Sequence, residues 1–327
     1  MKTLDLPLST RLLLEADLIP VQGHRFQPTG FPDVGAAVYS LPDGPEQLLV
    51  ESPQSVANRL EAVCWDESAN DLVGPLRGLP YVRVHDAKGQ YLTSSVHEAH
   101  RLNSVYIERT DFFESTLKPA IAFDEKAPHD RARLVRALAR FDVGCLLHGV
   151  FLESIGGTLR VPRALSGFIE AEGVQRVISG GVKNDRVQAS KDEEGGRTAS
   201  EGFGNVPFHR TEFAAKSITA YFNLDLAQIR AYRLGPEMDA LLVALALFKI
   251  HRFLASGLRL RTACDLEPSE LRVKGATDYT LPELQDLEVA LPALIVGASS
   301  HFASPATTIA TFPNGGAAKG SRKAGRS

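Results

Sequence analysis

The chain has 327 residues and a mass of 35.4 kDa, enough for one large domain with insertions or for about two domains. Hydrophobic residues make up 44% and charged residues 23%, which excludes wholesale disorder and collagen-like repeats. The net charge of −3 argues against a uniformly basic coat for nucleic acid. Residues 1–130 carry a net −8 and residues 131–327 a net +5, so we expect an anion-binding surface mainly in the second part.

The three cysteines indicate a reducing compartment. Cys64, Cys145 and Cys264 lie far apart and form no CxxC pair, which excludes a disulfide framework and a cysteine zinc site and favours buried thiols. The N-terminal sequence lacks the long apolar core of a signal peptide, and the longest apolar run, residues 240–248, is too short to span a bilayer. We therefore expect a cytoplasmic protein with no membrane partner.

The first half of the chain mixes predicted strands and helices. Residues 11–21 are expected to form a buried strand with Glu15 and Asp17 on one face, before a loop rich in glycine and proline. Ser52 and Pro53 fit the start of a helix. The other expected elements are a strand over 81–85, an ambiguous helix or strand over 93–107, a basic amphipathic helix over 129–140 and an apolar strand over 143–152 containing His148.

The second half begins with a segment that glycines interrupt repeatedly. Residues 154–207, with a polar run over 191–204, are expected to form an exposed excursion and not part of the core. A strand over 215–226, a helix over 236–256 and a strand over 287–296 follow, and residues 313–327 form a basic tail that we expect to be disordered. The order of elements favours an α+β fold, a sheet with helices on one face.

Few residues suggest catalysis or a cofactor. A P-loop, a GxGxxG dinucleotide motif and a GxSxG nucleophile motif are all absent. His97, Glu98 and His100 could bind a metal, with His85 as a further ligand, but their spacing differs from HExxH. A polar surface or hydrogen-bonded histidines is the preferred interpretation, and His148 is likewise interpreted as a hydrogen-bonded core residue. No cofactor is predicted.

Basic residues in glycine-containing loops are the more informative pattern. Arg160 and Arg163 occur in one such segment and Lys183 and Arg186 in another, while Arg25 stands beside an aromatic residue. Glycines let backbone amides approach a phosphate, and arginine and lysine side chains neutralise it. The alternative, an ordinary solvated loop, stays open on composition alone. No aromatic signature of a base-stacking RRM sheet is found.

Long stretches of the sequence resemble a known family, the backbone subunits of type I-U (also called I-G) CRISPR effector complexes, which belong to the RAMP superfamily. The resemblance covers residues from about 11 to 270, and the C-terminal tail lies outside it. The matching stretches are LLLEADLIPVQGHRFQPTGFPDVGAAVY, LLVESPQSVANRLE, TSSVHEAHRLNSVYI, RVPRALSGFIEAEGVQRVISGGVKNDRV and the helix that runs into SGLRLRTACDLE.

The resemblance implies a scaffold without catalysis. Its fold would be an RRM-like (ferredoxin-like) palm over residues 1–312, with finger and thumb excursions at about 154–207. Several copies would polymerise as a helical filament along one CRISPR RNA beside other Cascade subunits and present the guide to target DNA. The RNA contacts expected from the resemblance are Arg25, Arg160, Arg163, Lys183 and Arg186.

Two other classes of function are weighed against this one. The first is a metal-dependent nuclease or other hydrolase centred on His97, Glu98 and His100. The second is a scaffold made of protein only, which would carry no RNA. The prediction from sequence is the non-enzymatic RNA-binding backbone subunit, in which base pairing of the guide supplies specificity.

Overall fold

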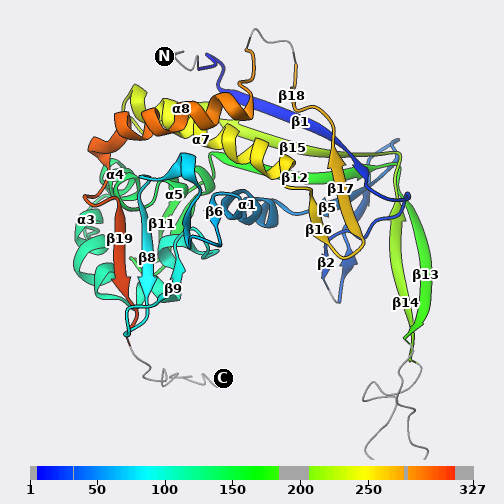
Figure 1. Ribbon diagram of the computed structural model, residues 1–327, viewed down its shortest axis with the longest axis horizontal. Coiled ribbons are helices and arrows are strands. Elements are labelled where there is room, and N and C mark those ends of the chain that lie inside the picture. Colours follow the sequence, from blue (N-terminus) through cyan, green and yellow to red (C-terminus); the bar gives the residue numbers. More distant parts are fainter. Residues whose placement is uncertain (1–5, 32, 184–205, 276–278, 314–327) are drawn as a thin grey trace, which may run out of the picture.

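The computed structural model describes residues 6–31, 33–183, 206–275 and 279–313 (Figure 1). Its centre is an antiparallel sheet. The strand order across the sheet is β16 (Arg259–Arg261), β17 (Cys264–Pro268), β1 (Arg11–Pro20), β15 (Ser217–Asp225), β12 (Leu165–Glu172), β5 (Glu46–Glu51) and β4 (Val38–Ser40). The short strand β18 (Arg272–Val273) also pairs with β1. The fold is therefore mixed α and β, as predicted.

One face of the sheet is apolar and packs against helices. Strands β1 and β15 alternate between buried and more exposed residues, so Leu14 is buried while Glu15 and Asp17 lie on the opposite face. Helix α1 (Pro53–Ala62) contacts β12, and α7 (Pro236–Ala255) contacts α1, β15 and β17. The Ser52 hydroxyl caps α1 by accepting a hydrogen bond from the Ser55 amide, as the sequence predicts.

A second layer of helix covers α7. Helix α8 (Leu284–Ala298) runs beside α7 along the sheet (Figure 1). The strand predicted over 287–296 is therefore wrong. Leu287, Leu291 and Ile295 are buried at a spacing of four, which fits one face of a helix, but a short apolar run does not by itself distinguish a buried helix from a buried strand.

A lobe inserted between α1 and β12 lies at one end of the sheet (Figure 1). Its small sheet joins β8 (Tyr81–His85) to β9 (Tyr91–Ser94) and, in parallel, to β19 (Thr307–Thr311) from the end of the described chain. The predicted strand over 81–85 and the helix near 129–140 are confirmed. The other elements of this lobe are β6 (Trp65–Asp66), β7 (Asp71–Leu72), α2 (Val105–Glu108), a π-helical turn (Phe113–Leu117), α3 (Lys118–Ile121) and α4 (Arg131–Phe141).

The apolar segment that follows α4 is not the single strand expected from the sequence. Residues Gly144–His148 form the short helix α5, and only Val150–Leu152 form a strand, β10, which pairs with β11 (Leu159–Val161). Helix α5 ends at Gly149, whose φ of +75° turns the chain into β10. The interpretation of His148 as a hydrogen-bonded core residue is confirmed, because His148 is buried and contacts Lys249.

The segment over 154–207 is only partly the excursion that the sequence predicts. Strand β12 lies inside the main sheet with alternate residues buried, so this part of the prediction is wrong. After β12, the chain leaves the sheet as a hairpin of β13 (Gln175–Lys183) and β14 (Val206–Ala214), which projects at the end opposite the lobe (Figure 1). The polar run over 191–204 lies outside the described residues, as does the tail from residue 314.

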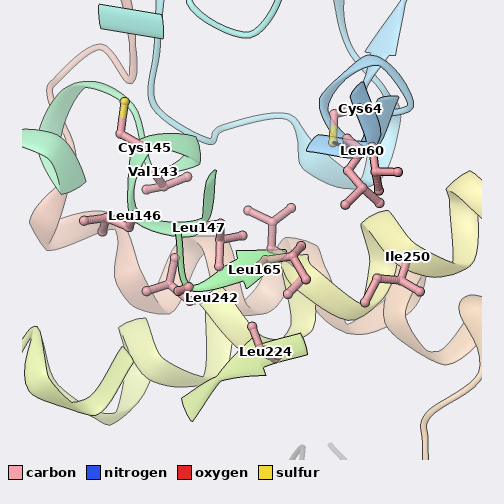
Figure 2. Packing of buried hydrophobic residues seen from close by; sticks show 14 of the residues in the cluster. Leu60, Cys64, Val143, Cys145, Leu146, Leu147, Leu165, Leu224, Leu242 and Ile250 are labelled. Carbon is pink, nitrogen blue, oxygen red and sulfur yellow. Dashed lines mark hydrogen bonds between the residues drawn. The ribbon is translucent and has the colours of Figure 1, made fainter. Parts of the chain in front are cut away.

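A continuous apolar core joins the sheet to the lobe. Figure 2 shows Leu165 and Leu224 from the sheet near Leu242 of α7, with Leu146 and Leu147 of α5 beside them. All three cysteines are buried as free thiols, as predicted. In the part of the chain that the structure describes, no helix has the length and apolarity needed to cross a membrane.

Candidate nucleic-acid interface

A groove of about 750 Å³ lies at the base of the β13–β14 hairpin. One wall comes from residues 27–30 and 34–36, at the short strands β2 (Gly30–Phe31) and β3 (Gly35–Ala36), and the other comes from the hairpin. Four basic side chains line it, namely Arg176, His209, Arg210 and Arg261. Such a groove can receive an extended anionic chain, because guanidinium groups bind phosphate oxygens well.

Arg25 lies next to this groove and attaches its loop to the hairpin. Its guanidinium donates a hydrogen bond to the nearly buried carboxylate of Glu212 at 3.0 Å, and the Ser179 hydroxyl donates to the same oxygen at 2.9 Å. The backbones of Phe26 and Phe213 also pair. Since Phe26 is only 1% exposed, the aromatic residue beside Arg25 is not available to stack a base.

Arg160 and Arg163 lie together in a different place. They line a hollow of about 460 Å³ in the inserted lobe, whose walls are β10, β11 and the turn at residues 99–103. The Arg160 guanidinium lies 4.7 Å from the centre of the Phe151 ring. Arg163 is half-buried, and burial lowers its pKa, with the nearby charge of Arg101 acting in the same direction.

The other two predicted contacts belong to the hairpin. Lys183 is the last residue of β13, and its backbone pairs with Val206. Arg186 lies outside the described residues. The five candidates therefore do not form one cluster: Arg160 and Arg163 share the hollow, Arg25 lies at the base of the hairpin and Lys183 lies at the far end of its first strand.

Sequence reasoning did not select most of the residues in the groove. Arg176 comes from the first strand of the hairpin, and His209 and Arg210 come from the returning strand. Their common location depends on the pairing of β13 with β14, whose described ends are separated by residues 184–205. The β-branched residues Val177, Ile178 and Val182 were the available signal for a strand.

His97, Glu98 and His100 are not brought together as metal ligands. The His97 ring contacts the Tyr91 hydroxyl at 2.8 Å and packs on Trp65, whereas the Glu98 carboxylate accepts hydrogen bonds from Thr93 and Ser104. His100 lines the hollow instead. Among the described residues, no group of three or more histidine, cysteine, aspartate or glutamate side chains is placed to hold a metal ion.

A buried charged network lies between α1, α7 and the inserted lobe. Arg101 makes a two-point hydrogen bond to Glu61, and Lys249 approaches the His148 Nε2 at 2.9 Å. Burial raises the pKa of Glu61 to about 7, although Arg101 and Lys249 oppose this shift. Burial also raises the pKa of Asp142 and lowers that of His148 well below its usual range. His148 is therefore neutral near pH 7.

The sheet face opposite the helices carries an aromatic pair that was not expected from the sequence. Phe168 of β12 and Tyr221 of β15 are cross-strand partners, and their rings stack with centroids 5.2 Å apart. Acidic side chains surround the pair: Glu15 binds Lys274 at 2.7 Å, and Glu170 accepts a hydrogen bond from Tyr39.

Comparison with known proteins identifies the family. The model of the family described as CRISPR-associated protein GSU0053 (Cas_GSU0053) matches residues 12–176, just over half of the chain. This chain belongs to the GSU0053 family of CRISPR-associated proteins. The match runs from β1 to the start of β13 and includes Arg25, Arg160 and Arg163. The resemblance to a RAMP-type CRISPR family that the sequence indicated is thereby confirmed.

Two solved structures show weaker likeness to this GSU0053-family chain. A chain of a structure titled "CRISPR RNA-guided surveillance complex, pre-nicking" has 13% identity and a TM-score of 0.41, with 88% of this chain and 87% of that chain covered. Csc2 of Thermofilum pendens has 8% identity and a TM-score of 0.29, with 90% and 81% covered. No curated protein matches the sequence.

Proposed function

We propose that this chain is the non-catalytic backbone subunit of a CRISPR effector complex. It binds CRISPR RNA, polymerises along the guide with other copies of itself and presents the guide for pairing with target DNA in antiviral defence. The observation that carries the proposal is the basic groove at the base of the projecting hairpin, in a member of a CRISPR-associated family. Other Cascade subunits would bind the ends and sides of the filament.

The topology of the sheet supports an RRM-like palm. Strands β17, β1, β15 and β12 are adjacent in that order and antiparallel, with α1 between β1 and β12 and α7 between β15 and β17. This is the β-α-β-β-α-β arrangement of a ferredoxin-like fold. We assign residues 1–312 to a single palm with insertions. Of these insertions, the β13–β14 hairpin is the thumb and the inserted lobe provides the finger elements.

In this assignment the basic side chains grip the guide through its phosphates. Arg25 lies beside the groove, and Arg160 and Arg163 lie in the hollow. We propose that Lys183, at the end of β13, and Arg186, which lies outside the described residues, add further phosphate contacts. Contacts of this kind neutralise phosphate without reading bases, so specificity comes from base pairing between guide and target. The sheet face with Phe168 and Tyr221 carries paired charges, with Glu15 bound to Lys274, and we assign this face to a protein neighbour.

Co-expression with a CRISPR array tests the proposal directly. The purified protein should carry short RNA, visible as a high ratio of absorbance at 260 to 280 nm and as a discrete band after extraction. One tryptophan and seven tyrosines absorb weakly, so bound RNA is easy to detect. Assembly of a filament that survives nuclease treatment and holds no RNA would instead indicate a scaffold of protein only. Cleavage of RNA that a chelator abolishes would instead indicate a metal-dependent nuclease.

Replacement of four basic residues tests the assigned RNA contacts. Alanine at Arg160, Arg163, Lys183 and Arg186 should weaken RNA binding equally for different guide sequences, because the contacts are to phosphates. The slope of log affinity against log salt should become shallower by up to about 3, at roughly 0.7 per lost contact with single strands. A matched control replaces Arg77, Lys88, Arg133 and Arg259, which are exposed and line neither the groove nor the hollow. Equal slopes in the two variants would refute the assignment.

A further inference from the structure

The hollow in the inserted lobe contains cations that lack an acidic partner. Among the described residues, no carboxylate forms an ion pair with Arg160 or Arg163, and no hydrogen-bond acceptor is found for the Arg163 guanidinium. His100 adds a third basic group to the lining. Glu153, the acid in the lining, is exposed. A half-buried guanidinium without an acidic partner is free to bind an anion that enters the hollow.

The histidine in the wall of the hollow is buried and held by a lysine from α7. His148 is 1% exposed, and its Nε2 lies 2.9 Å from the Lys249 Nζ. An ammonium group can only donate, so Nε2 is the acceptor and the proton of the neutral ring is on Nδ1. The Nδ1 atom is buried and has no hydrogen-bond partner. The neutral His148 ring therefore adds no positive charge to the wall of the hollow, and the permanent cations there are Arg101, Arg160 and Arg163.

An aromatic and guanidinium pair forms a flat surface on the side of the hollow. Phe151 is 41% exposed, and the Arg160 guanidinium lies 4.7 Å from its ring centre. Bases stack on such groups irrespective of sequence. Asn103 also lines the hollow, and its buried Oδ1 has no hydrogen-bond partner. Phosphate-binding groups and a stacking surface are thus present in a space of about 460 Å³.

We propose that this hollow binds a single nucleoside phosphate, with the phosphate held by Arg163 and the base stacked on Arg160 and Phe151. The inference deepens the proposed function, because it turns two general phosphate contacts into a site for one nucleotide. It does not require the rest of the guide, so it can be tested on the full chain purified without RNA.

Ligand-observed NMR with uridine 5′-monophosphate is the test. Saturation transfer to the uracil protons is expected with the parent chain, and both inorganic phosphate and an octauridine RNA should displace the nucleotide. Arg163→Gln should weaken binding of the nucleotide about tenfold, because it removes the charged donor. Phe151→Leu should weaken the nucleotide about fivefold or more yet leave displacement by phosphate within about twofold of the parent.

Arg77→Gln is the control, since Arg77 is exposed and lies outside the hollow, and it should bind as the parent does. Thermal unfolding of every variant shows whether it is folded, and Arg163→Lys, which keeps the charge, should retain part of the binding. A parent chain that gives no signal, or an Arg163→Gln variant that matches it, would overturn the proposal even if co-expression yields RNA. A chain that binds the nucleotide but carries no RNA after co-expression would refute only the proposed function. Displacement by octauridine identifies a strand as the source of the nucleotide, and failure to displace identifies free nucleotide.

Discussion

Glu212 shows how one carboxylate can join two segments that are distant in the sequence. The loop after β1 and both strands of the hairpin meet at its two oxygens, through Arg25, Ser179 and, at 3.7 Å, Arg210. Removal of this acid would leave two arginines without their partner at the base of the groove. The orientation of the hairpin relative to the sheet thus depends on a residue that binds no ligand itself.

We expect Glu212→Ala to lower the free energy of unfolding by about 1–3 kcal/mol, the usual effect of losing charged hydrogen bonds at a buried site. Urea denaturation followed by circular dichroism measures the change. Asp265→Ala is the matched control, because the Asp265–Arg259 pair is exposed, at 46% and 76% for the two side chains, and should contribute less than about 1 kcal/mol. An equal loss in both variants would show that Glu212 has no special role.

At the scale of elements, the boundary between α5 and β10 depends on Gly149. A Cβ at this position would lie 2.7 Å from the Val161 carbonyl oxygen and 3.0 Å from the Arg163 nitrogen. The glycine therefore allows the end of α5 to approach β11 closely, which builds one wall of the hollow. Its positive φ is a second reason for glycine at this position.

Gly149→Ala should destabilise the protein by more than Gly257→Ala does. Both glycines have a positive φ, so each substitution should cost about 1–2 kcal/mol from the backbone alone. Only Gly149 has neighbouring atoms within the reach of a Cβ, which should add roughly 1–3 kcal/mol of overpacking. Chemical denaturation of the two variants compares them. Equal costs would mean that the wall of the hollow can relax.

The elements that the sequence predicted correctly have signals that do not depend on distant contacts. The β1 strand alternates, α1 has a capping serine and a proline at its start, and α7 is too long to be a strand. The predictions for 143–152 and 287–296 were wrong because short apolar runs do not distinguish a buried helix from a buried strand. Residues 287–296 belong to the helix α8, which packs against α7, and this contact is not visible in the local sequence.

In the candidate site too, the positions that could be predicted are those that depend on residues close together in the sequence. Arg160 and Arg163 are three residues apart across the end of β11, so their common location could be predicted from sequence. The groove could not, because Arg176 and Arg210 meet only when two strands joined by a long connection pair with each other. The burial of Phe26 could not be predicted either, because it depends on pairing with Phe213, 187 positions further along the chain.

At the scale of the whole molecule, the Glu61–Arg101 pair links the inserted lobe to the helix layer of the sheet. Glu61 belongs to α1, Arg101 belongs to the lobe, and their side chains are only 4% and 7% exposed. Lys249 of α7 adds a third element to the same buried network. Because all of these charges lie away from water, each one depends on the others for compensation.

We expect Arg101→Met to cost about 3–5 kcal/mol of the free energy of unfolding near pH 8, where Glu61 is ionised and would be left without its partner. The double variant Glu61→Gln with Arg101→Met should recover part of this loss, since both charges are then absent. Lys118→Met, which breaks an exposed pair with Glu114, should cost at most about 0.5 kcal/mol. A double variant no more stable than the single one would show that packing, and not charge, dominates.

The raised pKa of Glu61 also predicts how stability depends on pH. The carboxyl group has a pKa near 4.5 in the unfolded chain and of about 7 in the folded chain. Between these values the folded state holds a proton that the unfolded state has lost, so the free energy of unfolding should fall as pH rises from about 4.5 to about 7 and then level off. Asp142, whose pKa burial also raises, contributes in the same direction.

Urea denaturation at about pH 5, 6, 7 and 8 measures this dependence of the free energy of unfolding on pH. Glu61→Gln should flatten the slope, whereas the exposed control Glu114→Gln should not. A parent and a Glu61→Gln variant with the same slope would mean that Glu61 stays ionised beside Arg101 throughout this range.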